Sequence, residues 1–140
     1  MTLRFGLIAT ILIMLNPSFS ASAQESGDPT GTWLTQSGDA KVQVSRCGGG
    51  ICDPTDPNTG KPAVDDKNPN PALRRRPMIG LPLFSGMQPS GTSRWAGRIY
   101  NADDGGTYDS DIAMMGPNSL RVNGCVGALC GGENWTRAKR

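Results

Sequence analysis

Two pairs of cysteines with the same spacing constrain most what this chain can fold into. Four residues separate the cysteines of each pair, which are Cys47, Cys52, Cys125 and Cys130. The spacing favours the bonds Cys47–Cys52 and Cys125–Cys130, while a pairing across the two loops stays open. Zinc sites use tighter cysteine pairs and often histidine, which is absent here, and redox catalysis needs a C-x-x-C pair or a poised thiolate. We therefore expect two structural disulfides, and neither a metal nor a cofactor.

The N-terminus has the pattern of a secretory signal peptide. A basic residue, Arg4, precedes an apolar run over 5–15, and small residues follow at 21–23. Cleavage is expected after Ala23, which makes 1–23 the signal. The remaining protein is then periplasmic or secreted, where disulfides persist.

The size and charge of the remaining chain suit one small soluble domain. Removing 23 residues from 140 leaves 117, which is one core's worth, and the later sequence has no run of ~20 apolar residues for a membrane helix. Without Arg4, 13 basic residues face 12 acidic ones, and this balance argues against nucleic-acid binding. We expect a disordered leader over 24–30 and a single domain over 31–138.

Short strands separated by turns are the main secondary-structure signal. The chain has 19 Gly and 11 Pro, which favours turns over helices. Alternation and turn residues predict strands at 32–35, 41–47, 78–84, 94–100, 107–115, 119–126 and 134–138. Such evenly spaced strands indicate an all-β fold, a small antiparallel barrel or sandwich.

The stretch between the first cysteine and residue 77 differs from the rest. It contains six prolines and few large apolar residues, so it predicts a long loop that is either functional or tied down. Asn70 and Pro71 could cap one helical turn over 72–76.

Tryptophans near both ends of the domain resemble a feature of calycin barrels. The sequence Gly31-Thr32-Trp33 lies in the first expected strand, and Trp135-Thr136-Arg137 in the last. In calycins a first-strand Trp stacks beneath an Arg of the last strand and closes one barrel end. The resemblance implies that Trp33 and Arg137 pack together, because a guanidinium can stack on indole and still bond carbonyl groups.

The stretch 31–137 also resembles the bacterial domain-of-unknown-function 2147 family. The matching pieces are GTWLT at 31–35, RCG at 46–48, NPNPAL at 68–73, RP at 76–77, IGL at 79–81, WAGRIY at 95–100, DGGTY at 104–108 and WTR at 135–137. The resemblance implies a small exported calycin-like β-barrel. It implies no function and no catalytic residues.

One departure from that family concerns the segment after Cys52. Family members usually carry a further strand there, whereas this chain runs into Asp53-Pro54-Thr55-Asp56-Pro57. The prolines cannot supply a regular ladder of donors, so either the barrel is incomplete or another segment or a partner fills the gap. An incomplete barrel would expose sheet edges, which could pair with a second copy or with an envelope partner.

Candidate site residues fall into three groups. Four aromatic side chains are expected either to pack the core or to line a small apolar pocket, namely Trp95, Tyr100, Tyr108 and Trp135. The run Arg74, Arg75 and Arg76 could contact an anion or simply face solvent. The aspartates of the long loop and of the Asp104 turn fit no calcium loop and are interpreted as solvated, namely Asp53, Asp56, Asp65, Asp66, Asp103, Asp104, Asp109 and Asp111.

These patterns favour a binding module over an enzyme. Without histidine, the usual catalytic triads and catalytic zinc sites are excluded. The leading hypothesis is a periplasmic barrel that binds a small apolar or amphipathic molecule. The alternative is an interaction protein of the cell envelope that pairs through an open sheet edge, and an aspartate-based hydrolase ranks last.

Overall fold

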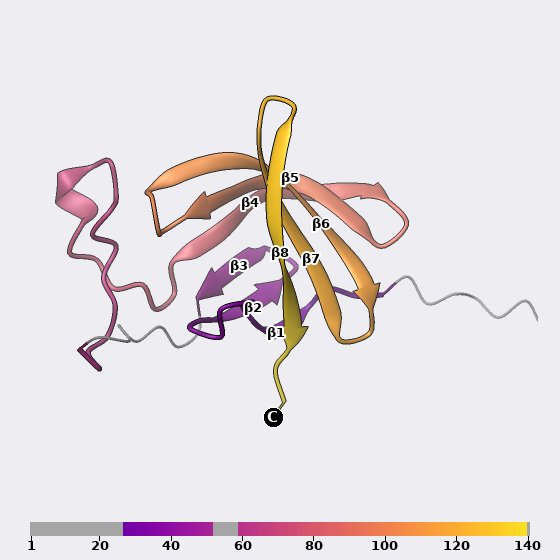
Figure 1. The fold of residues 1–140 in the computed structure, drawn as a ribbon, viewed down its shortest axis with the longest axis horizontal. Helices are drawn as coiled ribbons and strands as arrows, with labels where there is room; N and C mark the ends of the chain where they lie inside the picture. The colour runs from indigo at the N-terminus through magenta and orange to yellow at the C-terminus, as the bar shows by residue number, and fades with distance from the viewer. Residues whose placement is uncertain (1–26, 52–58, 140) are drawn as a thin grey trace, which may run out of the picture.

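The chain forms an antiparallel β-barrel (Figure 1). The structure, a computed structural model, describes residues 27–51 and 59–139. Its strands are β1 (Gly31–Leu34), β2 (Lys41–Ser45), β3 (Gly48–Ile51), β4 (Pro82–Gly91), β5 (Arg94–Asn101), β6 (Gly106–Gly116), β7 (Ser119–Val126) and β8 (Leu129–Arg137). Each strand pairs with the next, and β1 pairs with β8, so the sheet closes on itself. The predicted all-β, calycin-like class is confirmed.

The interior is packed by residues that alternate along the strands. In β2, Val42 and Val44 are buried while their neighbours are exposed, as period-two patterning requires. Trp33, Val42 and Leu120 have no exposed surface, and Trp135 is 3% exposed. Apolar side chains from β1, β2, β4, β6, β7 and β8 therefore share one core.

The strand β3 was missed from the sequence. Its three glycines read as a flexible turn, but glycine also adopts extended conformations, and β3 pairs with β2 and with β4. The sheet is closed through the described residues, so the alternative of an open barrel is not observed there. The segment where the family strand was expected, 52–58, lies outside the described residues.

Two of the strand pairs that close the barrel, β3–β4 and β1–β8, have shorter ladders than the β5–β6 pair. β5 and β6 pair over eight residues, whereas β3 and β4 pair at Gly49–Phe84 and Gly50–Pro82 only. β1 and β8 pair at Trp33–Arg137 and Leu34–Thr136. Short ladders at these two seams leave β1–β3 less tightly attached than the β4–β8 meander.

The two cysteine pairs behave differently although their spacing is the same. Cys125 and Cys130 face each other across the β7–β8 hairpin and form a disulfide, as predicted. In the β2–β3 hairpin Ser45 pairs with Gly48, so Cys47 lies in the turn itself and has no residue opposite. Cys47 is exposed and its thiol is free, and the Cys47–Cys52 bond stays a prediction. Cys52 lies outside the described residues.

The last residues of the predicted disordered leader are held against the barrel. The Gly27 amide donates to Ser93 Oγ at 3.0 Å, and Trp33 Nε1 donates to the Pro29 carbonyl at 2.8 Å. Residues 27–30 are therefore not a disordered leader. Hydrogen bonds from the Trp33 indole and the Arg137 guanidinium hold the backbone carbonyls of residues 28–30. The predicted signal peptide, 1–23, lies outside the described residues.

The long segment 59–81 lies beside the barrel and contains the short 3-10 turn η1 (Pro71–Leu73), at the left of Figure 1. Asn70 caps this turn by accepting from the Ala72 amide at 3.0 Å, close to the predicted helical turn. Among the described residues, helices long and apolar enough to cross a membrane are absent.

Candidate functional site

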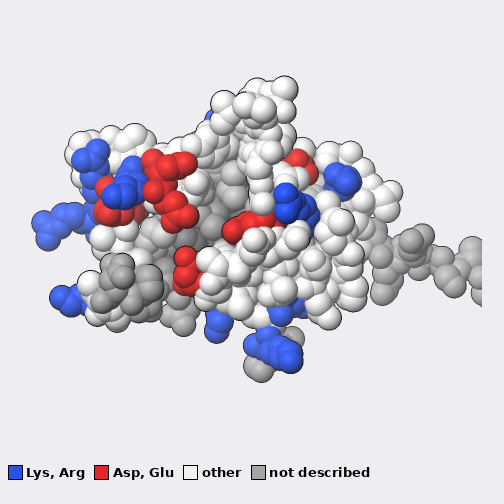
Figure 2. Space-filling model, viewed as in Figure 1, with Lys and Arg blue, Asp and Glu red and all other residues white. Residues whose placement is uncertain are grey.

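A cavity of about 1180 Å³ opens into the barrel between the segment 59–81 and the β7–β8 hairpin. Its lining includes apolar side chains of five strands, namely Val42, Leu83, Ile99, Val122 and Trp135. Figure 2 shows this face hollowed at its centre, with acidic atoms on both sides of the hollow. A hollow of this size, with an apolar floor and polar groups at the mouth, is typical of a small-molecule site.

Two glycines leave one cross-strand pair on the inner face of the β7–β8 hairpin without side chains. Gly124 and Gly131 pair with each other across the hairpin and both line the cavity. A Cβ placed on Gly131 would meet no atom within 4 Å, so any larger residue there would project into open space. The cavity therefore exists partly because glycines, which have no side chain, stand where this hairpin faces it.

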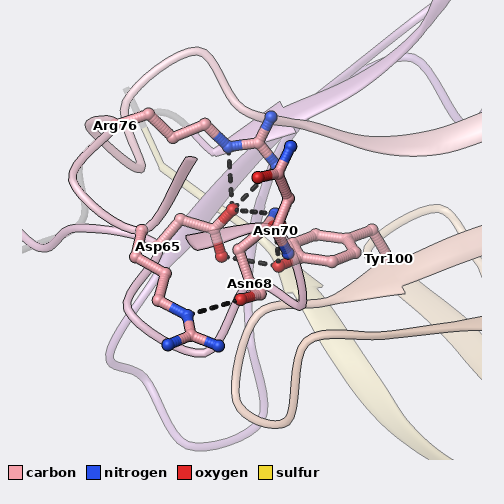
Figure 3. Close-up of polar contacts among 6 residues, drawn as sticks. Asp65, Asn68, Asn70, Arg76 and Tyr100 are labelled. Atoms are coloured by element: carbon pink, nitrogen blue, oxygen red, sulfur yellow. Dashed lines mark hydrogen bonds and ion pairs between the residues drawn. The ribbon is translucent and has the colours of Figure 1, made fainter. Parts of the chain in front are cut away.

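The segment 59–81 forms one wall of the cavity and is tied to the barrel by a buried carboxylate, Asp65 (Figure 3). The Tyr100 hydroxyl of β5 donates to Asp65 Oδ1 at 2.6 Å. Arg76 donates from both Nε and Nη2 to Oδ2, at 2.8 and 2.7 Å. Asn68 Nδ2 also donates to Oδ2, at 2.8 Å. Both carboxylate oxygens are thus occupied, and the wall is fixed to β5.

The pKa values of this cluster follow from burial and bonding. Burial alone would raise the pKa of Asp65, but hydrogen bonds from Tyr100, Asn68 and Arg76, with the charge of Arg76, lower it below 3.8. Burial, together with the hydrogen bond to Asp65, raises the pKa of Tyr100 above 10.0. At neutral pH the cluster therefore holds a charged carboxylate against a neutral phenol, which is an anchor and not an acid–base pair.

A second anchor of the same wall is the turn before β6. Gly105 has φ +75°, and a Cβ placed there would lie 2.0 Å from the Lys67 carbonyl oxygen. Only glycine allows both the turn and this close approach of two backbone segments.

The four predicted lining aromatics do not share one site. Tyr100, Tyr108 and Trp135 line the main cavity, whereas Trp95 lines a separate hollow of about 620 Å³ beside residues 27–30. At the main mouth Tyr108 donates to Asp104 Oδ2 at 2.7 Å, and this bond raises the pKa of Tyr108. Asp104 also accepts from the Gly106 amide, and this bond is the first cause of the lowered pKa of Asp104.

The predicted arginine cluster is also divided. Arg76 pairs with Asp65, and Arg74 Nε donates to the Asn68 carbonyl at 2.8 Å, so both act within the wall. Arg75 is exposed. The three side chains do not form a common anion site.

The expected contact at the barrel end is present. The Arg137 guanidinium lies over the Trp33 ring, 4.3 Å from its centroid. It also donates to the carbonyls of Pro117, Thr30 and Asp28. This pair is a structural closure and does not line the main cavity.

The aspartates that were interpreted as solvated differ in burial and in their hydrogen-bond partners. Asp65 is buried, so that interpretation is wrong for this residue. The sequence feature that could have indicated its ion pair is the opposite charge of Arg76, eleven residues later. Asp109 pairs with Arg98 at 3.7 Å on the outer surface, and Asp111 accepts from Asn123. Among residues 27–51 and 59–139, groups of three or more His, Cys, Asp or Glu side chains able to hold a metal are absent.

One lining residue was overlooked in the sequence. Glu133 lies two positions before the buried Trp135 in β8, and this spacing places both on the inner face. Strand alternation counted back from Trp135 would have found both Glu133 and Gly131.

Comparisons with known proteins agree with this fold. The family model "Uncharacterized protein conserved in bacteria (DUF2147)" matches residues 31–137. Protein HP1028 from Helicobacter pylori, described as belonging to the lipocalin family, is similar in structure, with a TM-score of 0.66 and 23% sequence identity over 81% of this chain and 84% of that one. At this identity the likeness shows the fold alone. No curated protein matches the chain.

Proposed function

We propose that this chain, which belongs to the DUF2147 family of uncharacterised bacterial proteins, binds a small apolar or amphipathic molecule inside its barrel. The observation that carries the proposal is the cavity of about 1180 Å³ with an apolar floor. Such a hollow would not persist in a barrel whose only task was to pack its own core, because interiors are normally filled.

The construction of the cavity wall supports binding and not catalysis. Two titratable groups at the wall are used as anchors: Asp65 is saturated by its donors, and the raised pKa of Tyr100 keeps its phenol neutral. A rigid wall suits a site that recognises a ligand by shape, since preorganisation lowers the entropic cost of binding.

We also propose that the protein works after export. The N-terminal signal pattern over 1–23 and the Cys125–Cys130 bond both suit an oxidising compartment. N-terminal sequencing of protein recovered from the periplasm would start near Gln24 if the signal is removed.

An interaction protein of the envelope is the second candidate. The closed sheet removes the open edge on which this idea rested, but the β7–β8 hairpin ends in two exposed apolar residues, Val126 at 65% and Leu129 at 81%, which also lie at the edge of the cavity lining. Light scattering of the purified protein separates the two: a dimer lost in a Val126→Ser, Leu129→Ser double variant would favour the second candidate.

Native mass spectrometry tests the binding proposal. Protein purified gently from its own host should carry an added small-molecule mass that disappears on denaturation. The variant Gly131→Trp projects an indole into the cavity, where it competes with a ligand for space, and should reduce or abolish that mass. The matched control Gly116→Trp, whose Cβ also meets no atom within 4 Å but which lies outside the cavity, should keep it. An added mass retained in full by Gly131→Trp would place the ligand elsewhere and reject the proposal.

A further inference from the structure

The inner face of the barrel carries one carboxylate, Glu133, among otherwise apolar or neutral lining from the strands. Glu133 lies in β8 opposite Val122, between Gly131 and Trp135 along the cavity face, and its side chain is half-buried. Trp135 Nε1 donates to Glu133 Oε1. Within the part of the chain that the structure describes, Glu133 takes part in none of the ion pairs, which are Lys67–Asp66, Arg76–Asp65 and Arg98–Asp109.

Among the described residues, Glu133 has the Trp135 indole as a hydrogen-bond donor and no opposite charge paired with it. Moving an ionised group toward apolar surroundings is unfavourable unless an opposite charge accompanies it. One indole N–H satisfies a single lone pair, which leaves Glu133 able to accept from a further donor. An incoming cation could supply the missing charge.

The mouth of the cavity carries an excess of negative charge, like Glu133. Its lining contains four more carboxylates, at Asp39, Asp66, Asp103 and Asp104, against two amines, at Lys61 and Lys67. Lys67 is already paired with Asp66, at 3.5 Å. Figure 2 shows red acidic atoms on both sides of the hollow. A hollow whose walls carry one sign of charge concentrates ligands of the opposite sign.

We propose that the ligand of this cavity is an amphipathic organic cation, with its apolar body on the barrel floor and its ammonium-type group at Glu133. This inference rests on the proposed function and adds the charge of the ligand. The Tyr108 ring lines the same cavity, and an aromatic face of this kind attracts an alkylated ammonium.

The test compares three probes that share one chain and differ in charge. Octyltrimethylammonium, octyl sulfate and 1-octanol are titrated by calorimetry below their micelle-forming concentrations. The cation is expected to bind at least about tenfold more tightly than the anion, a difference of about 1.4 kcal/mol. Added salt should reduce this preference, because the rim carboxylates are exposed.

The variant Glu133→Gln keeps an acceptor for Trp135 and removes the charge, so it should lose about tenfold in affinity for the cation and none for 1-octanol. The matched control Asp109→Asn removes the same charge from the outer surface, where the Asp109 side chain is 77% exposed, and should leave both affinities unchanged. The salt-dependent preference of the wild-type protein tests the same point if Glu133→Gln fails to fold.

The outcomes separate the two proposals. Equal binding of all three probes, abolished by Gly131→Trp, would overturn the cation assignment and leave the binding function standing. Tighter binding of octyl sulfate would overturn it in the same way. Binding of none of the three probes would overturn the proposed function and this inference together.

Discussion

The guanidinium of Arg137 lies 4.3 Å from the centroid of the Trp33 ring and bonds three backbone carbonyls around it, so it joins the last strand to the first. The β1–β8 ladder itself has only two residue pairs. The stacked pair therefore strengthens a strand pairing that has only two residue pairs. It also fixes residues 28–30 across the barrel end.

Arg137→Ala is expected to lower the free energy of unfolding by about 2 kcal/mol, because stacking, aliphatic packing and three hydrogen bonds are lost together. Arg137→Lys keeps the charge but cannot make the same fork of bonds, so it should recover less than half of the loss. Urea unfolding measures both. A fully stable alanine variant would show that the two-pair seam holds without the stacked side chain.

Asp65→Asn should cost about 2 kcal/mol, below the range for fully buried pairs, since the side chain of its partner Arg76 is 34% exposed. The pKa of Asp65 is lowered on folding, so its contribution is present above the unfolded value of about 3.9 and disappears as pH falls through the folded pKa. The stability gap between wild type and Asp65→Asn should therefore narrow below about pH 4. The control Asp66→Asn, on the surface, should show a small gap at every pH. A gap that widens with acid would contradict the assigned role.

Gly105 and Gly38 make a matched pair for separating backbone conformation from close packing. Both have positive φ, +75° and +77°, but only Gly105 has a carbonyl where its Cβ would lie. Gly38→Ala should cost about 1 kcal/mol from the left-handed conformation alone. Gly105→Ala must also displace the Lys67 segment and should cost at least about twice as much. Thermal unfolding compares the stability of the two variants. Equal losses of stability would mean that the Lys67 segment moves aside at no cost.

Cys47 should react with iodoacetamide in the native, unreduced protein, while Cys125 and Cys130 stay linked. Peptide mapping by mass spectrometry identifies each species. Cys47→Ser should change stability by less than about 0.5 kcal/mol, as for other exposed positions, whereas Cys125→Ser should cost about 2 kcal/mol. A Cys47–Cys52 peptide in protein from its own compartment would restore the pairing that the spacing suggested.

The regular part of the fold could be predicted because it follows alternation and turn residues. The strand predicted at 119–126 matches β7, and most others differ from the observed strands only at their ends, but those predicted at 78–84 and 134–138 overlap β4 and β8 only in part. The strand β3 could not be predicted, because three glycines carry no alternation and pair through their backbone alone. The two cysteine pairs have identical spacing, but their hairpins turn at different places: between Val126 and Leu129 for one pair, and at Cys47 itself for the other.

The site was predicted only in part for a similar reason. Tyr100, Tyr108 and Trp135 were expected to face a pocket, and they line the cavity. The cavity itself depends on absent side chains at Gly124 and Gly131, and on a wall whose anchor joins Asp65 to Tyr100 across 35 residues. Long-range contacts of this kind leave little trace in the local pattern of a single sequence.

The most direct test of the binding function is a titration with the neutral fluorophore N-phenyl-1-naphthylamine, which brightens in apolar surroundings. The wild-type protein should show saturable brightening at one site per chain. Gly131→Trp, which projects an indole into the cavity, should weaken or abolish it, and Gly116→Trp should preserve it. Brightening that survives Gly131→Trp unchanged, in a variant as stable as the wild type, would contradict the claim that this barrel binds a small molecule in its interior.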